Sequence, residues 1–160
     1  MPNLLSTRRE GNVFYFFLAI DDGTSIPSDV VLLSGHITPF LEEVRLSEGE
    51  SNAIHISLEE LLTNIGKFGR KGQDASATAD LLVAEGEIEI SPGSIKFLLS
   101  DNGVFFDPVA FPPPVLPDDP LDLVPGGLGI HVVKQLFTSL NYLRKDGKNI
   151  SEWVLSRSSS

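Results

Sequence analysis

Two amphipathic helix patterns follow one another directly, and this pairing constrains the fold more than any other feature of the sequence. Residues 27–46 and 51–68 both carry apolar side chains at steps of three and four, the period of a helix with one buried face. Runs of residues typical of strands lie on either side of these helices, at 12–20, 80–90, 94–100, 139–144 and 150–155. This order predicts an α+β fold, a two-layer α/β sandwich whose mixed, mostly antiparallel sheet is covered by helices on one face.

The length and composition fit a single folded domain. The chain has 160 residues, of which 41% are hydrophobic, and it contains no cysteine, so we expect neither disulfides nor a thiolate metal site. We take residues 1–160 as one domain with a core from residue 12 to residue 155. Residues 107–125 are rich in proline and form too long an irregular connection for a simple turn, which is typical of a lid or a binding loop.

The charge argues against two classes of partner. A net charge of −10 disfavours nucleic acid and anionic membrane surfaces, since both attract basic proteins. The longest apolar run, at residues 13–20, is too short to span a bilayer, and residues 1–11 lack the apolar stretch of a secretion signal. We therefore expect a cytoplasmic protein that binds neither nucleic acid nor a membrane.

A polar stripe runs along the second helix beside its core-facing residues. Glu60, Asn64 and Lys67 stand three or four residues apart, so they share one side of the helix. A carboxylate accepts a proton from a hydroxyl group or from water, and an amide oxygen one turn away is a ligand for Mg²⁺. The alternative is a solvated helix face with an incidental asparagine.

The strand pattern at residues 94–100 runs straight into Asp101, Asn102 and Gly103. In a functional interpretation, Asp101 projects into a pocket and accepts a hydrogen bond from an exocyclic amine, while Gly103 leaves room for a flat ring. The alternative is a common turn, since an aspartate followed by a glycine favours one through side-chain hydrogen bonding and positive φ.

Three glycines, Gly126, Gly127 and Gly129, introduce an apolar helix pattern at residues 128–138. Glycine raises the entropy cost of ordering the chain, so such a cluster suggests that the backbone approaches something closely. A Walker-type loop would need G-x-x-x-x-G-K-[ST], which is absent, and a dinucleotide fingerprint would need a strand directly before the glycines. The amides of a helix N-terminus remain as an anion site. The alternative is a glycine-rich turn with close helix packing.

In their order along the chain, these features resemble the histidine kinase-like ATPases of the GHKL superfamily. The segments that carry the resemblance are LEELLTNIGKFG, DNGVFFDP, GGLGIHVVKQL and YLRKDGKN. They are most similar to the bacterial anti-sigma factor serine/threonine-protein kinases, over about residues 12–155. The resemblance implies a fold of the GHKL type, with residues 107–125 as the ATP lid, and an ATP-dependent protein kinase activity.

The resemblance also implies a role for each candidate residue. Asn64 would ligate a Mg²⁺ ion that bridges the phosphates of ATP, and Glu60 would act as general base toward a serine hydroxyl or water. Asp101 would bind the adenine amino group, with Gly103 beside the ring. The segment that encloses the phosphates would consist of Gly126, Gly127, Leu128, Gly129 and Ile130.

Protein partners are implied in the same way. Kinases of this family phosphorylate a serine of a small anti-anti-sigma protein of the STAS type, and they also sequester a sigma factor. Because the two partners compete, phosphorylation regulates transcription by partner switching. The usual form of these kinases is a homodimer, which we expect here.

Several residues depart from the family pattern. The lid contains no Lys or Arg, so Lys67 or Lys134 would have to supply a cation for the terminal phosphate. Glu152 is the nearest position on the last strand to a threonine that faces adenine in relatives, and Arg70 replaces an aromatic residue. An alternative function is therefore a non-catalytic nucleotide-binding module that sequesters a protein partner, and a third is a simple ATP hydrolase.

Overall fold

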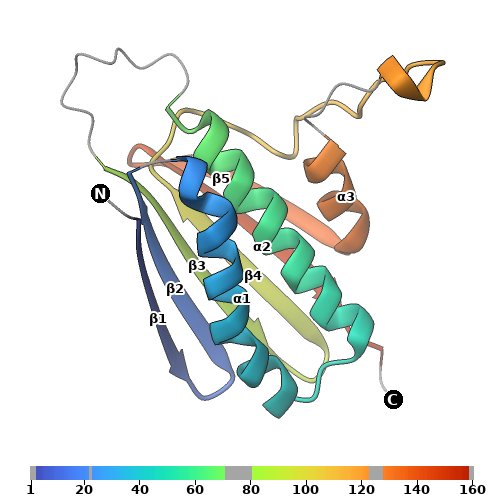
Figure 1. Cartoon of the computed structure of the whole chain (residues 1–160). Helices are drawn as coiled ribbons and strands as arrows, with labels where there is room; N and C mark the ends of the chain where they lie inside the picture. Colours follow the sequence, from blue (N-terminus) through green and yellow to red (C-terminus); the bar gives the residue numbers. More distant parts are fainter. Residues whose placement is uncertain (1–2, 22, 71–80, 123–127, 159–160) are drawn as a thin grey trace.

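The computed structural model describes residues 3–21, 23–70, 81–122 and 128–158. Within these residues, a six-stranded sheet forms one layer and the helices form the other (Figure 1). The strands are β1 (Leu4–Glu10), β2 (Val13–Ile20), β3 (Leu82–Ile90), β4 (Ser94–Asp101), β5 (Ser139–Lys145) and β6 (Lys148–Ser156). The helices are α1 (Ile26–Glu43), α2 (Glu48–Phe68) and α3 (Leu128–Leu136), with short 3-10 turns η1 (Gly23–Ser25) and η2 (Pro120–Asp122). The expected two-layer α+β sandwich is confirmed.

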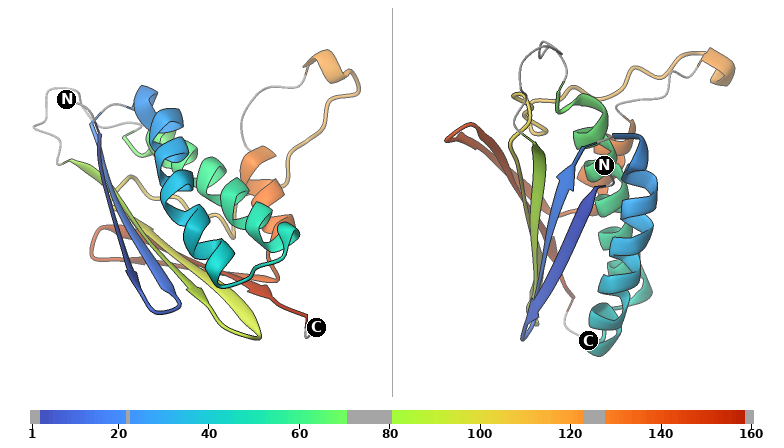
Figure 2. Two further views of the ribbon diagram at one scale, coloured as in Figure 1. Left: turned by 60° about the horizontal axis from the view of Figure 1, so that its bottom comes forward. Right: turned by 60° about the vertical axis from the view of Figure 1, so that its left-hand side comes forward.

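The strands are arranged in the order β1-β2-β3-β4-β6-β5, and every neighbouring pair is antiparallel. The two views in Figure 2 show α1, α2 and α3 together on one face of the sheet, so the core lies between the layers. Within the part of the chain that the structure describes, no helix combines the length and the apolar character needed to cross a membrane.

β1 is the strand that the sequence did not predict. It pairs with β2 across a turn in which Gly11 has a φ of 58°, a left-handed backbone that glycine adopts without strain. Because β1 is an edge strand, most of its side chains are exposed or half-buried, and no apolar alternation marks it in the sequence.

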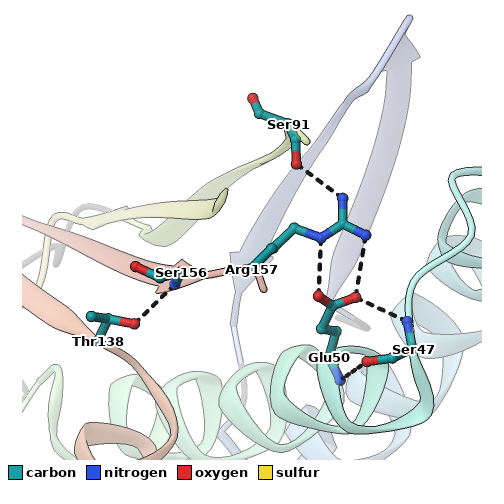
Figure 3. Close-up of polar contacts among 6 residues, drawn as sticks. All are labelled: Ser47, Glu50, Ser91, Thr138, Ser156 and Arg157. Atoms are coloured by element: carbon teal, nitrogen blue, oxygen red, sulfur yellow. Dashed lines mark hydrogen bonds and ion pairs between the residues drawn. The ribbon is translucent and has the colours of Figure 1, made fainter. Parts of the chain in front are cut away.

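α2 begins at Glu48, three residues before the predicted start, because a capping box fixes its first turn. The Ser47 hydroxyl accepts from the Glu50 amide at 3.1 Å, and the Glu50 carboxylate accepts from the Ser47 amide at 2.9 Å. Arg157, after β6, donates to the same carboxylate at 3.0 and 3.3 Å and to the Ser91 carbonyl oxygen at 2.9 Å (Figure 3). The N-terminus of α2 is thereby attached to the end of β6 and to the turn between β3 and β4.

The core consists of the inner faces of α1, α2 and the sheet. The predicted helix stripes are confirmed except at the end of α2, where Phe68, expected on the core face, is 43% exposed. Fully buried members from both layers include Leu33, Ile37, Ile54, Leu58, Leu62, Ile88, Phe97 and Trp153. Burying a side chain of this size contributes about 1.5–3 kcal/mol. On β3, Gly86 lies opposite Phe16 of β2, and a Cβ at position 86 would overlap the Phe16 ring. The aromatic side chain thus fills the space that the glycine leaves.

The proline-rich segment leaves the body of the domain as an extended chain and ends in η2 (Figure 1). Val115 is 95% exposed and Leu121 is 92% exposed, so the outer part of this segment contributes nothing to the core. The predicted lid continues to residue 125, and residues 123–125 lie outside the described part of the chain.

Candidate functional site

A pocket of about 510 Å³ opens between α2, the inner face of the sheet and the loop after β4. This volume falls in the range of small-molecule and cofactor sites. Apolar side chains dominate its walls, among them Ile65, Phe68, Phe106, Phe111 and Trp153. Polar side chains also line it, namely Asn64, Asp101, Tyr142, Asn149 and Ser151. Apolar walls with a few polar groups suit a flat heteroaromatic ring that carries hydrogen-bonding edges.

Asp101 is the last residue of β4, and its side chain lines the pocket. Its Oδ1 atom accepts hydrogen bonds from the Gly103 amide at 2.9 Å and from Asn149 Nδ2 at 3.0 Å. Burial raises the pKa of Asp101, while these two hydrogen bonds and the nearby Arg144 guanidinium act to lower it. Among the described residues no donor contacts Oδ2, so this oxygen is available to a ligand.

Gly103 brings the loop after β4 against the end of α2. A Cβ at position 103 would lie 3.0 Å from Gly69 Cα and 3.1 Å from the Gly69 carbonyl oxygen, which accepts from the Val104 amide at 2.8 Å. Gly69 is the C-cap of α2, with a φ of −59°. A Cβ at position 69 would lie 2.6 Å from the Ile65 carbonyl oxygen and 2.9 Å from Leu82 Cδ2, so close packing and not a left-handed backbone explains this glycine. Gly103 is not among the lining residues in the described structure, so the room it would leave for a ring stays a prediction.

Glu60 and Asn64 stand one turn apart on α2, which packs against α3. Asn64 lines the pocket. Glu60 is half-buried, and its carboxylate lies so close to Gly129 that a Cβ at position 129 would overlap Oε2. The two polar side chains of this stripe therefore extend from the pocket to the N-terminal turn of α3.

Of the segment from Gly126 to Ile130, the structure describes residues 128–130. Leu128 is the first residue of α3 and is half-buried, whereas Ile130 is buried and lines the pocket. Gly126 and Gly127 lie outside the described residues, so their phosphate contacts stay a prediction. The N-terminal amides of α3 lie next to Gly129 and the Glu60 carboxylate, which is where a helix favours an anion.

A family model for the histidine kinase-like ATPase domain matches residues 25–151. The chain belongs to this family. The matched range contains the helices α1, α2 and α3, Asp101 and the candidate residues of α2, and it includes every lining residue of the pocket except Trp153. No curated protein matches the chain significantly.

In the structure of this histidine kinase-like ATPase domain, neither candidate lysine lines the pocket. Lys67 is exposed. Lys134 of α3 donates from Nζ to the carbonyl oxygens of Val109 at 3.3 Å and Phe111 at 3.5 Å, near the start of the proline-rich segment. Among the described residues Lys134 thus contacts the backbone of the predicted lid, and a phosphate contact by either lysine stays a prediction.

Three residues of β6 line the pocket of the ATPase domain, and Glu152 is not among them. Asn149, Ser151 and Trp153 alternate along the strand toward the pocket, whereas Glu152 lies between them and points to the opposite face of the sheet, across from Leu98 of β4. Glu152, the position nearest to the family's threonine, is therefore outside the pocket lining, because neighbouring residues of a strand lie on opposite faces of the sheet.

Asn149 and Tyr142 are pocket residues that sequence reasoning missed. The Tyr142 hydroxyl donates to Asn149 Oδ1 at 2.7 Å, so the two strands of the last hairpin both contribute. The available signal was the alternation of Asn149 with buried Trp153, which marks the asparagine as an inward position.

Arg70 stands where the similar kinases often have an aromatic residue, and its side chain makes hydrogen bonds to the backbone. Its guanidinium donates to the carbonyl oxygens of Ile20 at 2.7 Å and Asp21 at 2.9 Å. These hydrogen bonds attach the end of α2 to the end of β2 on one side of the ATPase domain.

Proposed function

We propose that this domain binds ATP with Mg²⁺ and transfers the terminal phosphoryl group to a serine hydroxyl of a partner protein. One observation carries the proposal: the Glu60 carboxylate lies against Gly129 at the N-terminus of α3, one helical turn from Asn64 in the pocket. A potential base, a potential metal ligand and an anion-binding helix terminus are therefore neighbours. Asp101 lies in the same pocket, with one carboxylate oxygen available to the base.

In the proposed reaction, the serine oxygen attacks the terminal phosphorus while the bond to the bridging oxygen breaks, and ADP leaves with the bonding electron pair. Glu60 accepts the hydroxyl proton as the new oxygen–phosphorus bond forms. The N-terminal amides of α3 stabilise the charge on the phosphates. Few other side chains are required, because phosphoryl transfer depends mainly on positioning and electrostatic stabilisation.

Asn64 fits a Mg²⁺ site because its amide supplies a hard oxygen ligand at the edge of the pocket. One protein ligand is sufficient, since Mg²⁺ retains several waters and takes its remaining ligands from phosphate oxygens. When bound, the ion neutralises phosphate charge. This role for Asn64 is supported by its position one turn from Glu60 on the same side of α2.

The partners are proposed from the resemblance of the four motif segments. We place the protein in the cytoplasm as a homodimeric anti-sigma factor kinase that phosphorylates a serine of a STAS-type anti-anti-sigma protein. In its other complex it would sequester a sigma factor, so that phosphorylation switches partners and regulates transcription.

A second function deserves a test because of one observation. Residues 107–125 contain acidic residues but no Lys or Arg, and Lys134 is hydrogen bonded to the backbone at the lid base. A site without a cation for the terminal phosphate would transfer it slowly. The domain would then hold ATP as a structural ligand and regulate a partner by binding alone.

Glu60→Gln and Glu59→Gln form a matched pair that tests the proposal. Glu59 neighbours Glu60 on α2 but is exposed, so its variant controls for the loss of one charge from the helix. With Mg²⁺-ATP and candidate STAS-type proteins, we expect Glu60→Gln to lower phosphoserine formation about 100-fold or more, as expected for loss of a general base. ATP binding by calorimetry should stay within about threefold, since base recognition is unchanged.

Each result has a distinct meaning. Equal rates for Glu60→Gln and the wild type would show that another group accepts the proton. A stable complex of the wild-type protein with a candidate partner, without phosphoserine by mass spectrometry after long incubation, would support the non-catalytic function. Failure to bind ATP would overturn both.

A further inference from the structure

Asn149 is a buried polar residue at the centre of the pocket's hydrogen-bond network. Its side chain is on the inward face of β6, and the residue is 6% exposed. Its Nδ2 donates to Asp101 Oδ1 at 3.0 Å and to the Val104 carbonyl oxygen at 2.8 Å. Its Oδ1 accepts from the Phe106 amide at 3.1 Å and from the Tyr142 hydroxyl at 2.7 Å. All the hydrogen-bonding positions of this amide are thus used.

These contacts allow one orientation of the amide. The Val104 carbonyl oxygen can only accept, and the Phe106 amide can only donate, so the nitrogen and oxygen of Asn149 cannot exchange places. The Tyr142 hydroxyl must then donate to Asn149. Because the orientation is fixed by two backbone groups and one side chain, the donor that faces Asp101 is always an N–H.

The orientation of Asn149 determines which atom of Asp101 a ligand meets. Asp101 Oδ1 already accepts from Asn149 and from the Gly103 amide, so these two donors hold the carboxylate plane. In the described structure Oδ2 has no donor, and the side chain lines the pocket. The ligand therefore meets a fixed acceptor, which attracts an exocyclic amine and repels a carbonyl oxygen at the same position.

We propose that Asn149, itself oriented by Tyr142, is the positioning residue that gives this site its preference for a base with an exocyclic amino group. The proposal rests on the nucleotide binding proposed above and adds the residues that make Asp101 selective. A residue that acted only through stability would weaken the binding of every base equally. A residue that orients Asp101 changes the ratio of affinities for bases with and without the amine.

The test compares ATP with purine riboside triphosphate, which lacks the 6-amino group but is otherwise the same. Dissociation constants are measured by calorimetry for the full chain and for three variants: Asn149→Ala, Tyr142→Phe and Asp101→Ala. In the wild type, ATP should bind at least about tenfold more tightly, the value of one good hydrogen bond. Asn149→Ala and Asp101→Ala should bring this ratio close to one, and Tyr142→Phe should lower it about two- to fivefold.

Matched controls come from the other face of the sheet. Tyr15 and Asn141 lie on strands but outside the pocket lining of the described structure, so Tyr15→Phe and Asn141→Ala should leave the affinity ratio unchanged. In an Asp101→Ala background, Asn149→Ala should cause no further change in the ratio. If Asn149→Ala fails to fold, Tyr142→Phe, which removes a single oxygen, becomes the test. A lowered ratio of the two nucleotide affinities in this variant would support the proposal, and an unchanged ratio would overturn it.

The possible outcomes separate this inference from the proposed function. A wild-type protein that binds neither nucleotide would refute the proposed function and this inference together. If the wild type prefers ATP and Asp101→Ala removes the preference, nucleotide recognition stands. An unchanged ratio in both Asn149→Ala and Tyr142→Phe would then overturn the role of Asn149 alone.

Discussion

The carboxylate of Glu60 occupies the space that a side chain at Gly129 would need. An added Cβ at position 129 would overlap Oε2 and would lie 2.8 Å from the carboxyl carbon of Glu60. The contact joins α2 to the first turn of α3, two elements separated in the sequence by β3, β4 and the lid. The glycine therefore determines where the proposed base stands relative to the proposed phosphate site.

Gly129→Ala should consequently displace the Glu60 carboxylate without unfolding the domain. The clash involves the far end of a flexible side chain, which can rotate away. Alanine also favours a helix over glycine by up to about 1 kcal/mol, so the free energy of unfolding should change little. Phosphoryl transfer should fall about tenfold or more, because a small displacement of a catalytic group carries such a cost.

Gly35→Ala is the matched control for this substitution. Gly35 lies inside α1, and nothing is within 4 Å of an added Cβ there. This variant should be as stable as the wild type or slightly more so, with unchanged transfer. Normal transfer by Gly129→Ala, measured as phosphoserine formed per minute, would contradict the functional importance of the Glu60–Gly129 contact.

Asp101→Asn should weaken nucleotide binding strongly while keeping the domain stable. The new amide oxygen still accepts from Gly103 and Asn149, but an N–H replaces the available oxygen and meets the amine of the base with a donor. ATP affinity should fall about 30-fold or more, as expected for losing a charged acceptor and gaining a repulsive contact. Asp29→Asn, at a buried carboxylate outside the described pocket lining, should leave ATP affinity unchanged.

The stability of the same variant should depend on pH in a definite direction. Burial raises the folded-state pKa of Asp101 above its ordinary value of about 3.9. The stability that Asp101 contributes is thus fully present below that value and is lost as the pH rises through the folded-state pKa. Asp101→Asn should therefore gain stability relative to the wild type between pH 3 and pH 7 in urea denaturation. A relative loss over this range would contradict the effect of burial on the carboxylate.

How much of this domain the sequence predicts depends on how much of each element is buried. The apolar stripes of α1 and α2 are long and periodic, so both helices and the layered fold were predicted. β1 was missed because an edge strand with exposed side chains has no such periodicity. The start of α2 was placed late because a capping box, and not an apolar residue, sets it.

The residues of the candidate site were likewise predictable only where a local sequence pattern marks them. Glu60, Asn64 and Asp101 stand at helical spacing or at a strand end, so local sequence patterns suggested them. The roles of Asn149 and Tyr142 depend on which face of β6 and β5 meets the pocket, and that follows from the pairing of β6 with β4. Pairing between distant strands leaves no local pattern, so the sequence alone did not show that Glu152 faces away from the pocket.

Arg157→Ala should destabilise the domain by about 1–2 kcal/mol, the range of a charge-assisted hydrogen bond to a partly buried carboxylate. The guanidinium contacts Glu50 through two nitrogens and holds the first turn of α2 against the end of the sheet (Figure 3). Arg8→Ala is the control, because the Arg8–Glu10 ion pair is largely exposed and should contribute less than about 1 kcal/mol. The measurement is urea denaturation at neutral pH.

Low pH should remove the contribution of Arg157 to the free energy of unfolding. Its hydrogen bonds lower the folded-state pKa of Glu50 below the ordinary value of about 4.3. The stability from this pair is therefore present above that pH and is lost as the pH falls through the folded-state pKa. Wild type and Arg157→Ala should differ most at pH 6–7 and converge near pH 3. A constant difference over this range would show that Arg157 stabilises the fold by packing and not by its charge.

Gly86→Ala should be the most destabilising of these substitutions. The added methyl group would overlap the Phe16 ring, which is 3% exposed and surrounded by core side chains. Overpacking of this kind costs about 1–3 kcal/mol. Gly93→Ala is the control, because an added Cβ at position 93 has no neighbour within 4 Å.

A second substitution distinguishes this clash from a general effect of alanine on β3. Phe16→Leu shortens the opposing side chain, so the double variant Gly86→Ala with Phe16→Leu should be more stable than the sum of the two single changes predicts. The expected coupling is about 1 kcal/mol or more, since residues in direct contact are not additive. Additive losses in thermal or urea denaturation would mean that the glycine at position 86 is required for another reason than the approach of Phe16.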